Sequence, residues 1–582
     1  MSGVTESPVL QALTAYAPRP HPAPCDLDLA GGTSAGWADA SIATTLAAGC
    51  ARLSRYPDPR ELVRRISTRL GIAPARVLVT AGADEALERA CRSVLSTGRN
   101  AVLTDPTFEM LPRYVALAGG TVRPVAWPDG PFPVEEVIAR ADARTALIAI
   151  VSPNNPTGAV ASFAEIRRVH DAVPDAMLLL DLAYVEFAAT DPTSQALTLP
   201  RAVVVRTLSK AWGLPGIRVG YAAGAEALVD GMRRAGGPYP VSSLSLAVAE
   251  AALDADPAGR DATIARVRAN RDKLESLLAS LGQAPTPSQG NFVSVSGPRA
   301  GWIRDALAGF GIAVRFLGAP DRAGGGVDRV RITVPDSEQA MERLGRALSI
   351  ALSPETILFD LDGVLADVSG SYREAIRRTA ATFGVFVPPE AISARKARGQ
   401  ANDDWALTHE LAAAGGSRAT YTEVREVFEQ WYQGTSAEPG LREAECLTVE
   451  RAWLLGLARE YPLAIVTGRP RADAEWFLAR VGIADCFRGV VAREDGPLKP
   501  DPFPVARALQ LLGVTRAWML GDTPDDIRSA RGAGVLPLGV VLGPAATNWQ
   551  EPENADQLRT ALFAAGAARV FNSPTGLTSC LR

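Results

Sequence analysis

The 582-residue chain has few histidines and cysteines. Its three histidines, at positions 21, 170 and 409, argue against both a multi-histidine metal site and a histidine-dependent catalytic triad. We therefore interpret them as surface or packing residues. None of the six cysteines forms a Cys-x-x-Cys pair, which argues against a zinc ribbon or disulfide scaffold and favours reduced thiols.

Long apolar runs and an excess of positive charge are also missing. No run approaches the roughly 18 to 20 apolar residues needed to cross a bilayer, and the first residues do not resemble a signal peptide. The formal net charge of -4 gives no basic footprint for nucleic acid. We expect a cytoplasmic protein of two to four domains that binds small molecules, with neither a membrane nor a nucleic-acid partner.

Short apolar runs alternate with helical patterns between residues 56 and 223. The runs lie at 76–80, 101–104, 146–151, 177–180, 202–205 and 219–223. This alternation predicts an α/β fold with a mostly parallel sheet covered by helices.

One lysine with polar neighbours follows the run at 202–205. Thr207 and Ser209 precede and flank Lys210, and Arg218 comes eight residues later. An amine can bond an aldehyde, while hydroxyls and a guanidinium can hold a phosphate. The stretch therefore indicates a site for a phosphorylated aldehyde, pyridoxal phosphate.

Three earlier strand ends carry polar or aromatic groups. Ala83 and Asp84 open a helix whose backbone N–H groups could face an anion, although an ordinary helix start is the alternative. Phe108 could cover a planar cofactor or simply belong to the core. Asn155 lies in a rigid turn at 152–158.

A carboxylate and a phenol follow the apolar run at 177–180. Asp181 is costly to bury unless it pairs with a cation or a strong donor, and a protonated pyridine nitrogen is such a partner. Tyr184 follows three residues later.

The order Asn155, Asp181, Tyr184, Lys210, Arg218 resembles the class I/II aminotransferases of the pyridoxal phosphate type I fold. Within these, the histidinol-phosphate aminotransferase group is the most similar. The resemblance covers about residues 1 to 350, with matching segments at 56–59, 82–85, 153–158, 209–211 and 331–334.

The resemblance implies a role for each matching residue. Lys210 bonds the cofactor aldehyde and then moves the substrate proton, and Asp181 pairs with the cofactor's ring nitrogen. Asn155 and Tyr184 bind the ring hydroxylate, and Phe108 stacks on the ring. The groups implied to hold the cofactor phosphate are the backbone at Ala83 and Asp84, with Thr207, Ser209 and Arg218.

Further residues concern the substrate and the assembly. By the same resemblance, Tyr56 reaches the cofactor phosphate of a neighbouring subunit, which implies a homodimer. Arg331 clamps a substrate carboxylate or phosphate, with Arg315 as a second anion contact. Leu182 stands where many relatives carry glutamate, and Phe108 where they usually carry tyrosine. These departures leave the reaction class intact and the substrate open.

A second acidic motif begins after the short segment 351–355. Asp360 and Asp362 follow the apolar run at 356–359. Two such close carboxylates need a cation, and Mg2+ bridging to a phosphate would provide it, whereas a simple acidic turn is the alternative. Polar residues also end later strands, at Thr467, Lys499 and Asp522.

This order resembles the haloacid dehalogenase superfamily across residues 354 to 582. The resemblance implies that Asp360 is the nucleophile that becomes aspartyl phosphate, and that Asp362 is the acid and then the base. Thr467 and Lys499 would bind the phosphoryl group. The implied Mg2+ site comprises Asp360, Asp362 and Asp522, with Asp525 or Asp526 supporting bound water.

A helical cap is predicted at about residues 370–455 of this second domain. Four of its residues could read the substrate or simply lie on a solvated helix face: Lys396, Arg398, Asn402 and Trp405.

We therefore predict two domains: an aminotransferase with two lobes at 1–352, and a Rossmann-like hydrolase with a cap at 353–582. The expected activities are transamination of a small amino compound such as histidinol phosphate, and hydrolysis of a phosphate monoester. A decarboxylase of a phosphorylated amino acid with an attached phosphatase is the alternative. A catalytically idle binding protein is disfavoured because every expected catalytic position is filled.

Overall fold

The computed structural model describes residues 6–11, 13–16, 20–32, 41–318, 327–399, 403–543 and 552–581. The described residues divide into two compact units. The first draws on Met1–Arg19, Leu29–Ala300 and Val314–Glu342, and the second on Pro20–Asp28, Gly301–Ala313 and Arg343–Arg582. The boundary expected at 352/353 stays a prediction.

The first unit contains a seven-stranded sheet in the order β2-β8-β7-β6-β5-β3-β4. All neighbouring strands are parallel except at β8, which runs antiparallel to both β2 and β7. This confirms the predicted α/β fold. The strands are β2 (Val77–Thr80), β3 (Asn100–Asp105), β4 (Thr121–Ala126), β5 (Thr145–Val151), β6 (Met177–Asp181), β7 (Ala202–Thr207) and β8 (Gly220–Gly224).

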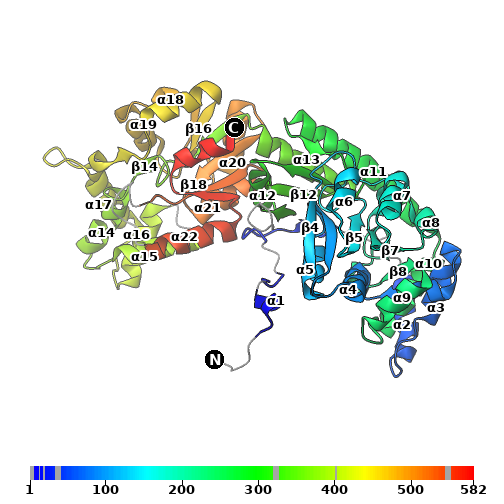
Figure 1. Ribbon diagram of the computed structural model, residues 1–582. Helices are drawn as coiled ribbons and strands as arrows, with labels where there is room; N and C mark the ends of the chain where they lie inside the picture. Colours follow the sequence, from blue (N-terminus) through cyan, green and yellow to red (C-terminus); the bar gives the residue numbers. More distant parts are fainter. Residues whose placement is uncertain are drawn as a thin grey trace. The chain divides into compact units, whose positions relative to one another are not determined.

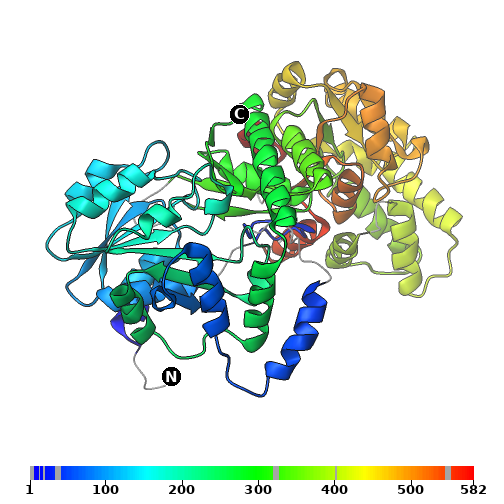
Figure 2. The same cartoon turned by 90° about the vertical axis from the view of Figure 1, so that its right-hand side faces the viewer.

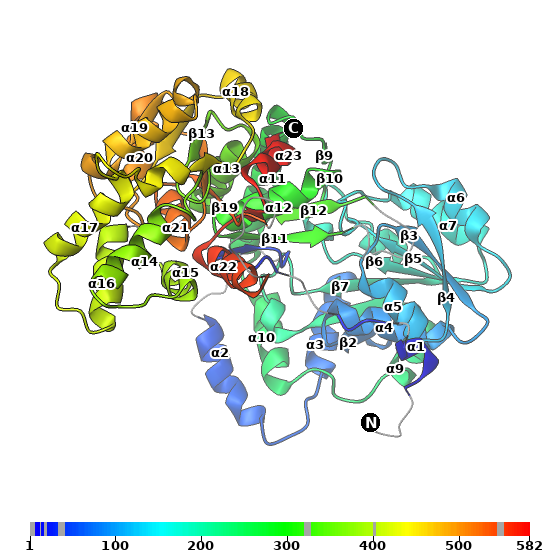
Figure 3. The ribbon, with the colours of Figure 1, turned by 90° about the vertical axis from the view of Figure 1, so that its left-hand side faces the viewer.

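Helices cover both faces of this sheet (Figure 3). Alternate residues of β5 point to opposite faces, so Leu147 and Ala149 pack in one core and Ile148 and Ile150 in the other. Helices α4 (Gly82–Val94), α5 (Met110–Leu117) and α9 (Glu226–Arg234) contribute to the first core, and α6 (Val134–Arg140) and α7 (Phe163–Ala172) to the second.

The remaining elements of the N-terminal half include a small antiparallel sheet. Its strand β12 pairs with β10 on one side and with β11 on the other, with Arg315 opposite Arg331. The elements are α1 (Pro8–Gln11), β1 (Leu27–Leu29), α2 (Ser41–Gly49), α3 (Arg60–Leu70), α8 (Thr193–Ala196), α10 (Ser243–Asp254), α11 (Pro257–Ser280), β9 (Pro285–Thr286), β10 (Phe292–Ser296), β11 (Ile312–Leu317) and β12 (Arg329–Thr333).

The second unit contains a six-stranded parallel sheet in the order β17-β16-β13-β18-β19-β20. Two of its strands, β16 and β18, are labelled in Figure 1. Its strands are β13 (Thr356–Phe359), β16 (Leu463–Val466), β17 (Gly489–Val491), β18 (Ala517–Gly521), β19 (Leu536–Val540) and β20 (Arg569–Phe571). Its helices are α18 (Arg451–Glu460), α19 (Arg471–Arg480), α20 (Phe503–Leu512), α21 (Pro524–Gly532), α22 (Pro552–Ala565) and α23 (Thr578–Leu581).

A group of four helices is inserted between β13 and β16 (yellow-green in Figure 2). Buried Tyr372, Phe428 and Tyr432 pack together in its core, with Tyr372 and Tyr432 ring centroids 4.4 Å apart. We call this group the cap; it comprises α14 (Tyr372–Thr382), α15 (Pro389–Arg398), α16 (Asp404–Ala414) and α17 (Tyr421–Gln433). The short strands β14 (Ala366–Asp367) and β15 (Cys446–Leu447) pair beside it.

Two tryptophans join helical segments to the six-stranded sheet. Trp518 on β18 donates to the Ile350 carbonyl at 2.7 Å, and Trp302 on α12 (Ala300–Gly309) donates to the Ala351 carbonyl at 3.0 Å. Their ring centroids lie 4.8 Å apart. The last turns of α13 (Glu338–Leu352) are thereby fixed against β18. Three residues then separate the end of α13 from the start of β13. No helix in the described ranges is long and apolar enough to span a membrane.

Candidate active sites

A cavity of about 370 Å³ opens at the carboxyl ends of the strands in the seven-stranded sheet. Parallel strands bring their following loops to this edge, so side chains distant in sequence meet there. The lining includes ten residues expected to hold the cofactor: Ala83, Asp84, Phe108, Asn155, Asp181, Tyr184, Thr207, Ser209, Lys210 and Arg218.

Lys210 presents its amine to this cavity. The Lys210 Nζ atom lies 5.1 Å from the centroid of the Tyr184 ring and donates to the Gly31 carbonyl at 3.4 Å. Both are weak contacts compared with an ion pair, so within the described part of the chain the amine has no strong partner to displace before it bonds a ligand.

Asp181 is a buried carboxylate at the end of β6, with 5% of its surface exposed. Burial raises the pKa of Asp181 to about 7; the Ala183 N–H, which donates to Oδ1 at 3.1 Å, and the charge of Lys210 only partly oppose this. A cationic donor beside Asp181 would favour the ionised form. The carboxylate therefore suits a protonated ring nitrogen.

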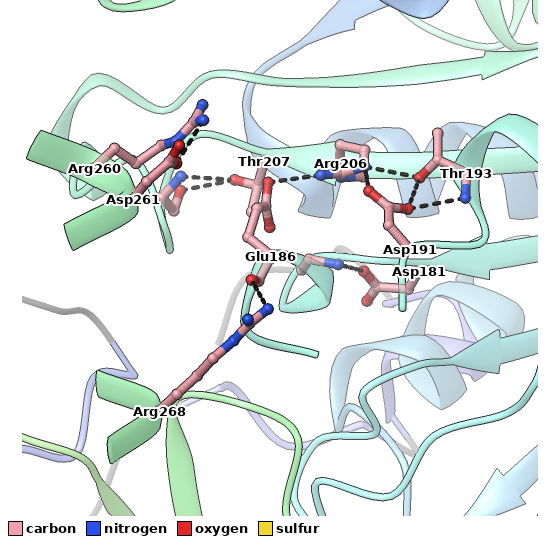
Figure 4. A network of polar contacts seen from close by, with 11 residues as sticks. Asp181, Glu186, Asp191, Thr193, Arg206, Thr207, Arg260, Asp261 and Arg268 are labelled. Atoms are coloured by element: carbon pink, nitrogen blue, oxygen red, sulfur yellow. Dashed lines mark hydrogen bonds and ion pairs between the residues drawn. The ribbon is translucent and has the colours of Figure 1, made fainter. Parts of the chain in front are cut away.

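A polar network fixes the turn that follows Asp181 (Figure 4). Arg206 on β7 donates to Glu186 at 2.7 Å and to Asp191 at 3.1 Å, and both Arg206 and Glu186 are largely buried. Arg268 on α11 donates to the Glu186 carbonyl at 2.9 Å. Because Glu186 follows Tyr184 closely, these contacts hold the segment between Asp181 and Tyr184 in place.

The opposite end of the cavity is built for an anion. Ala83 lies in the first turn of α4, where backbone N–H groups have no partner within the helix. Thr207 donates to Ser209 at 2.9 Å, and Arg218 pairs with Asp84 at 2.9 Å. A Cβ on Gly82 would come within 2.7 Å of the Arg218 guanidinium, so this approach requires glycine.

The two predicted substrate arginines project from neighbouring strands. Arg331 is buried and donates to Asn155 Oδ1 at 2.7 Å and to the Ala30 carbonyl at 2.7 Å. Arg315 pairs with Glu109 at 2.6 Å. Arg331 therefore reaches a residue that lines the cavity. Tyr56, by contrast, is 82% exposed and stacks on Tyr239 at 4.8 Å; it is not among the residues that line the cavity.

Gly32 and Tyr16 lie near the cavity, and neither was singled out in the sequence. A Cβ on Gly32, where φ is +64°, would lie 3.3 Å from Lys210 Nζ and 3.6 Å from an Arg331 nitrogen. Tyr16 lines the cavity and accepts from Arg315 at 3.3 Å. The paired glycines at 31 and 32 were a signal for the first; Tyr16 had none.

Replacing Asp181 with asparagine should stabilise the protein without cofactor at alkaline pH. The native pKa is about 7 against 3.8 for an ordinary aspartate, so unfolding releases the proton and stability falls as pH rises between these values. Above pH 7 the buried, ionised carboxylate lowers the free energy of unfolding by about 4 kcal/mol. Thermal unfolding of both proteins should show an advantage for D181N that grows from pH 5 to pH 8. A lower midpoint for D181N at pH 8 would contradict the buried, uncompensated carboxylate.

A second cluster of charges lies at the carboxyl ends of β13 and β18. Lys499 is buried and pairs with Asp360 at 2.8 Å and with Asp526 at 2.5 Å. Carboxylate oxygens of Asp360, Asp522 and Asp526 lie within 4.8 Å of one another. Burial and the neighbouring carboxylates raise the pKa of Asp360, and burial raises that of Asp522 to about 7.

This cluster fits a divalent cation. The Asp522 Oδ1 atom is buried and has no hydrogen-bond partner among the described residues. A Cβ on Gly363 would lie 2.1 Å from the other Asp522 oxygen, so only glycine allows the carboxylate this position. Oxygen ligands and excess negative charge are what Mg2+ prefers.

Asp362 and Thr467 make other contacts. The Asp362 carboxylate lies outside the three-carboxylate cluster and accepts from Arg469 Nε at 2.6 Å. The Thr467 hydroxyl, at the end of β16, accepts from the Arg469 backbone N–H at 3.1 Å. Asp525 is buried and pairs with Arg528 at 3.2 Å.

The cap contributes to a small cavity beside Asp362. Its lining includes Trp405 and Asp404, and Asp404 pairs with Lys396 at 3.0 Å. The guanidinium groups of Arg425 and Arg493 each lie 4.4 Å from the centroid of the Trp405 ring. Of the four candidate cap residues, Arg398 is exposed and Asn402 lies outside the described residues.

Comparisons with known proteins agree with both sites. Residues 27–348 match the aminotransferase class I and II family, and residues 354–534 match the haloacid dehalogenase-like hydrolase family. Histidinol-phosphate aminotransferase 2 of Methylococcus capsulatus is 35% identical over 277 residues, which cover 45% of this chain and 74% of that protein.

Two further relatives extend this picture. A protein of Phytophthora nicotianae named imidazoleglycerol-phosphate dehydratase is 45% identical over 195 residues, which cover 32% of this chain and only 43% of that protein. The crystal structure of histidinol-phosphate aminotransferase from Sinorhizobium meliloti in complex with pyridoxal-5'-phosphate aligns with a TM-score of 0.53 at 25% identity. It covers 60% of this chain and 97% of that one.

The predicted resemblances and fold class are therefore confirmed, as is the prediction of an enzyme with two family domains. The chain belongs to the class I and II aminotransferases and carries a haloacid dehalogenase-like hydrolase domain in its C-terminal part.

Proposed function

We propose that the chain is a bifunctional enzyme that transfers an amino group with pyridoxal phosphate and hydrolyses a phosphate monoester with Mg2+. The observation that carries the proposal is that one chain holds two buried carboxylate sites, each beside a lysine. Asp181 lies near Lys210 in the first, and Asp360 pairs with Lys499 in the second.

In the first site, Asp181 would hold the ring nitrogen of the cofactor and Asn155 with Tyr184 its ring oxygen. The first turn of α4 and the residues around Thr207 would bind the phosphate. When bound, the cofactor supplies an electron sink for the substrate α carbon. The Lys210 Nζ atom removes the proton from that carbon, and Arg331 orients the substrate through an anionic group.

In the second site, a carboxylate oxygen of Asp360 forms a bond to phosphorus while the bond between phosphorus and the ester oxygen breaks. Asp362 gives its proton to the departing oxygen, which leaves as an alcohol. Water then attacks phosphorus, its proton returns to Asp362, and inorganic phosphate and free Asp360 result. Lys499 and Thr467 would hold the phosphoryl oxygens, and Mg2+ would neutralise the clustered charges near Asp522.

A phosphorylated amino compound would suit both sites. Histidinol phosphate, or an analogue, carries both an amino group and a phosphate ester, and several relatives are named for it. In histidine synthesis the amino group is installed before the phosphate is removed, so joining the two activities in one chain would serve consecutive steps. We also propose that the protein forms a homodimer in which Tyr56 reaches the partner subunit's cofactor. We propose in addition that the protein is cytoplasmic.

A substrate screen separates this proposal from its alternative. We expect purified holoenzyme, given phosphorylated amino compounds and a 2-oxo acid, to form the corresponding amino acid, detected by mass spectrometry. We also expect inorganic phosphate release that requires Mg2+. Carbon dioxide from a phosphorylated amino acid, without amino transfer, would instead establish the decarboxylase.

A further inference from the structure

Arg469 is a fully buried guanidinium between two carboxylates of the hydrolase unit. Only 1% of its side chain is exposed. Its Nε donates to Asp362 Oδ1 at 2.6 Å, and its Nη1 donates to Glu445 Oε2 at 2.9 Å. The side chain of Glu445 is completely buried. Arg469 therefore has two ionic partners, and their charges compensate for the loss of hydration of its guanidinium group.

The cap surrounds the same guanidinium. Arg469 Nη1 donates to the Tyr432 hydroxyl of α17 at 3.2 Å. The centroid of the Tyr372 ring of α14 lies 4.8 Å from Arg469 Cζ. The Arg469 backbone N–H meanwhile donates to Thr467. One residue therefore connects the cap, the end of β16 and Asp362.

These contacts fix Asp362 more tightly than a flexible surface pair would. The Nε and Nη2 atoms of Arg469 both contact Oδ1 of Asp362, and the planar guanidinium constrains the direction from which each N–H donates. Asp362 also lines the small cavity beside the cap. A carboxyl group that must reach a departing ester oxygen gains from such an orientation, since small misplacements of a catalytic group are costly.

We propose that Arg469 is a positioning residue that orients the Asp362 carboxyl group for proton transfer to the leaving alcohol. The inference rests on the proposed hydrolase function and adds a residue to it. Neither sequence motif assigned Arg469 a role. The effect of replacing Arg469 on kcat/KM should depend on how strongly the leaving group needs a proton.

The test compares two substrates in the full-length enzyme with Mg2+. The leaving group of an alkyl phosphate is a strongly basic alkoxide, which needs the proton. The leaving group of p-nitrophenyl phosphate is a weakly basic phenolate, which does not. We expect Arg469→Met to lower kcat/KM for the alkyl ester relative to p-nitrophenyl phosphate by about a hundredfold. Arg469→Lys should restore part of this ratio. The ratio does not depend on the fraction of enzyme that folds.

Two controls separate orientation from structural support. Arg469→Met strands the buried Glu445 carboxylate, so the double variant Arg469→Met with Glu445→Gln removes both charges and should show the same change in ratio. Glu445→Gln alone keeps the contact to Asp362 and should leave the ratio unchanged. In an Asp362→Asn background, Arg469→Met should have little further effect on the ratio, because both act through one group.

The measured ratios support or overturn the positioning role of Arg469. An unchanged ratio in both Arg469 variants, or a full additional effect in the Asp362→Asn background, would overturn the positioning role. Failure of the wild-type enzyme to release phosphate in a manner that Asp360→Asn abolishes would overturn the hydrolase proposal instead. The two failures are therefore distinguishable.

Discussion

Replacing Lys210 with alanine should abolish amino transfer and leave phosphate ester hydrolysis intact. The Lys210 amine lies in the cavity near Asp181 and Tyr184, and among the residues that the structure describes no other lysine lines that cavity. Loss of the group that we propose moves the substrate proton should lower the rate by about 10⁴-fold or more. Formation of the amino product, measured by mass spectrometry, and phosphate release should be assayed on the same preparation.

The cofactor spectrum provides an independent readout. Wild-type protein should show the visible absorbance of pyridoxal phosphate bonded to a lysine, and this band should disappear in K210A. The matched control is Lys273→Ala, which removes an exposed lysine from α11. Wild-type amino transfer in K210A, or loss of the band in the Lys273 variant alone, would contradict the assignment.

Replacing Asp360 with asparagine should abolish phosphate release and leave amino transfer intact. Asp360 pairs with Lys499 at 2.8 Å and belongs to the three-carboxylate cluster. Removal of the proposed nucleophile should cost about 10⁴-fold or more in rate. We expect the variant to fold, because Lys499 retains Asp526 at 2.5 Å and the repulsion among the carboxylates falls.

Mg2+ binding gives a second measurement for D360N. Titration of wild-type protein with Mg2+ should raise its thermal unfolding midpoint, since the ion binds only the folded cluster, and D360N should show a smaller rise. Asp485→Asn, at an exposed position of the same unit, is the matched control. Wild-type phosphate release by D360N would show that the ester is hydrolysed elsewhere.

Many of the residues that line the cavity could be named from the sequence because they lie at or soon after the ends of strands. Asp181 ends β6, whereas Asn155 and Lys210 lie in the turns that follow β5 and β7, and parallel strands bring such positions to one edge. Gly32 could not be placed in this way. Its importance lies in the close approach of Lys210 and Arg331, which come from distant parts of the chain.

The hydrolase site shows the same limit. Asp360 and Asp522 directly follow β13 and β18, and Lys499 lies in the loop between β17 and α20; all three could be named from their order in the sequence. The carboxylate of Asp526 joins their cluster, whereas that of Asp362 contacts Arg469. The importance of Arg469 depends on Glu445 and on the cap, since tertiary packing rather than spacing brings these groups together. The pairing of Trp302 with Trp518 likewise had no local signal.

The most direct test of a bifunctional enzyme follows both reactions on one compound. Histidinol phosphate with a 2-oxo acid should be incubated with wild-type protein, K210A and D360N, each loaded with pyridoxal phosphate and Mg2+. The account predicts that wild-type protein gives both amino transfer and phosphate, that K210A gives only phosphate, and that D360N gives only amino transfer. Loss of both reactions in either folded variant, or the absence of both from the wild-type protein, would contradict it.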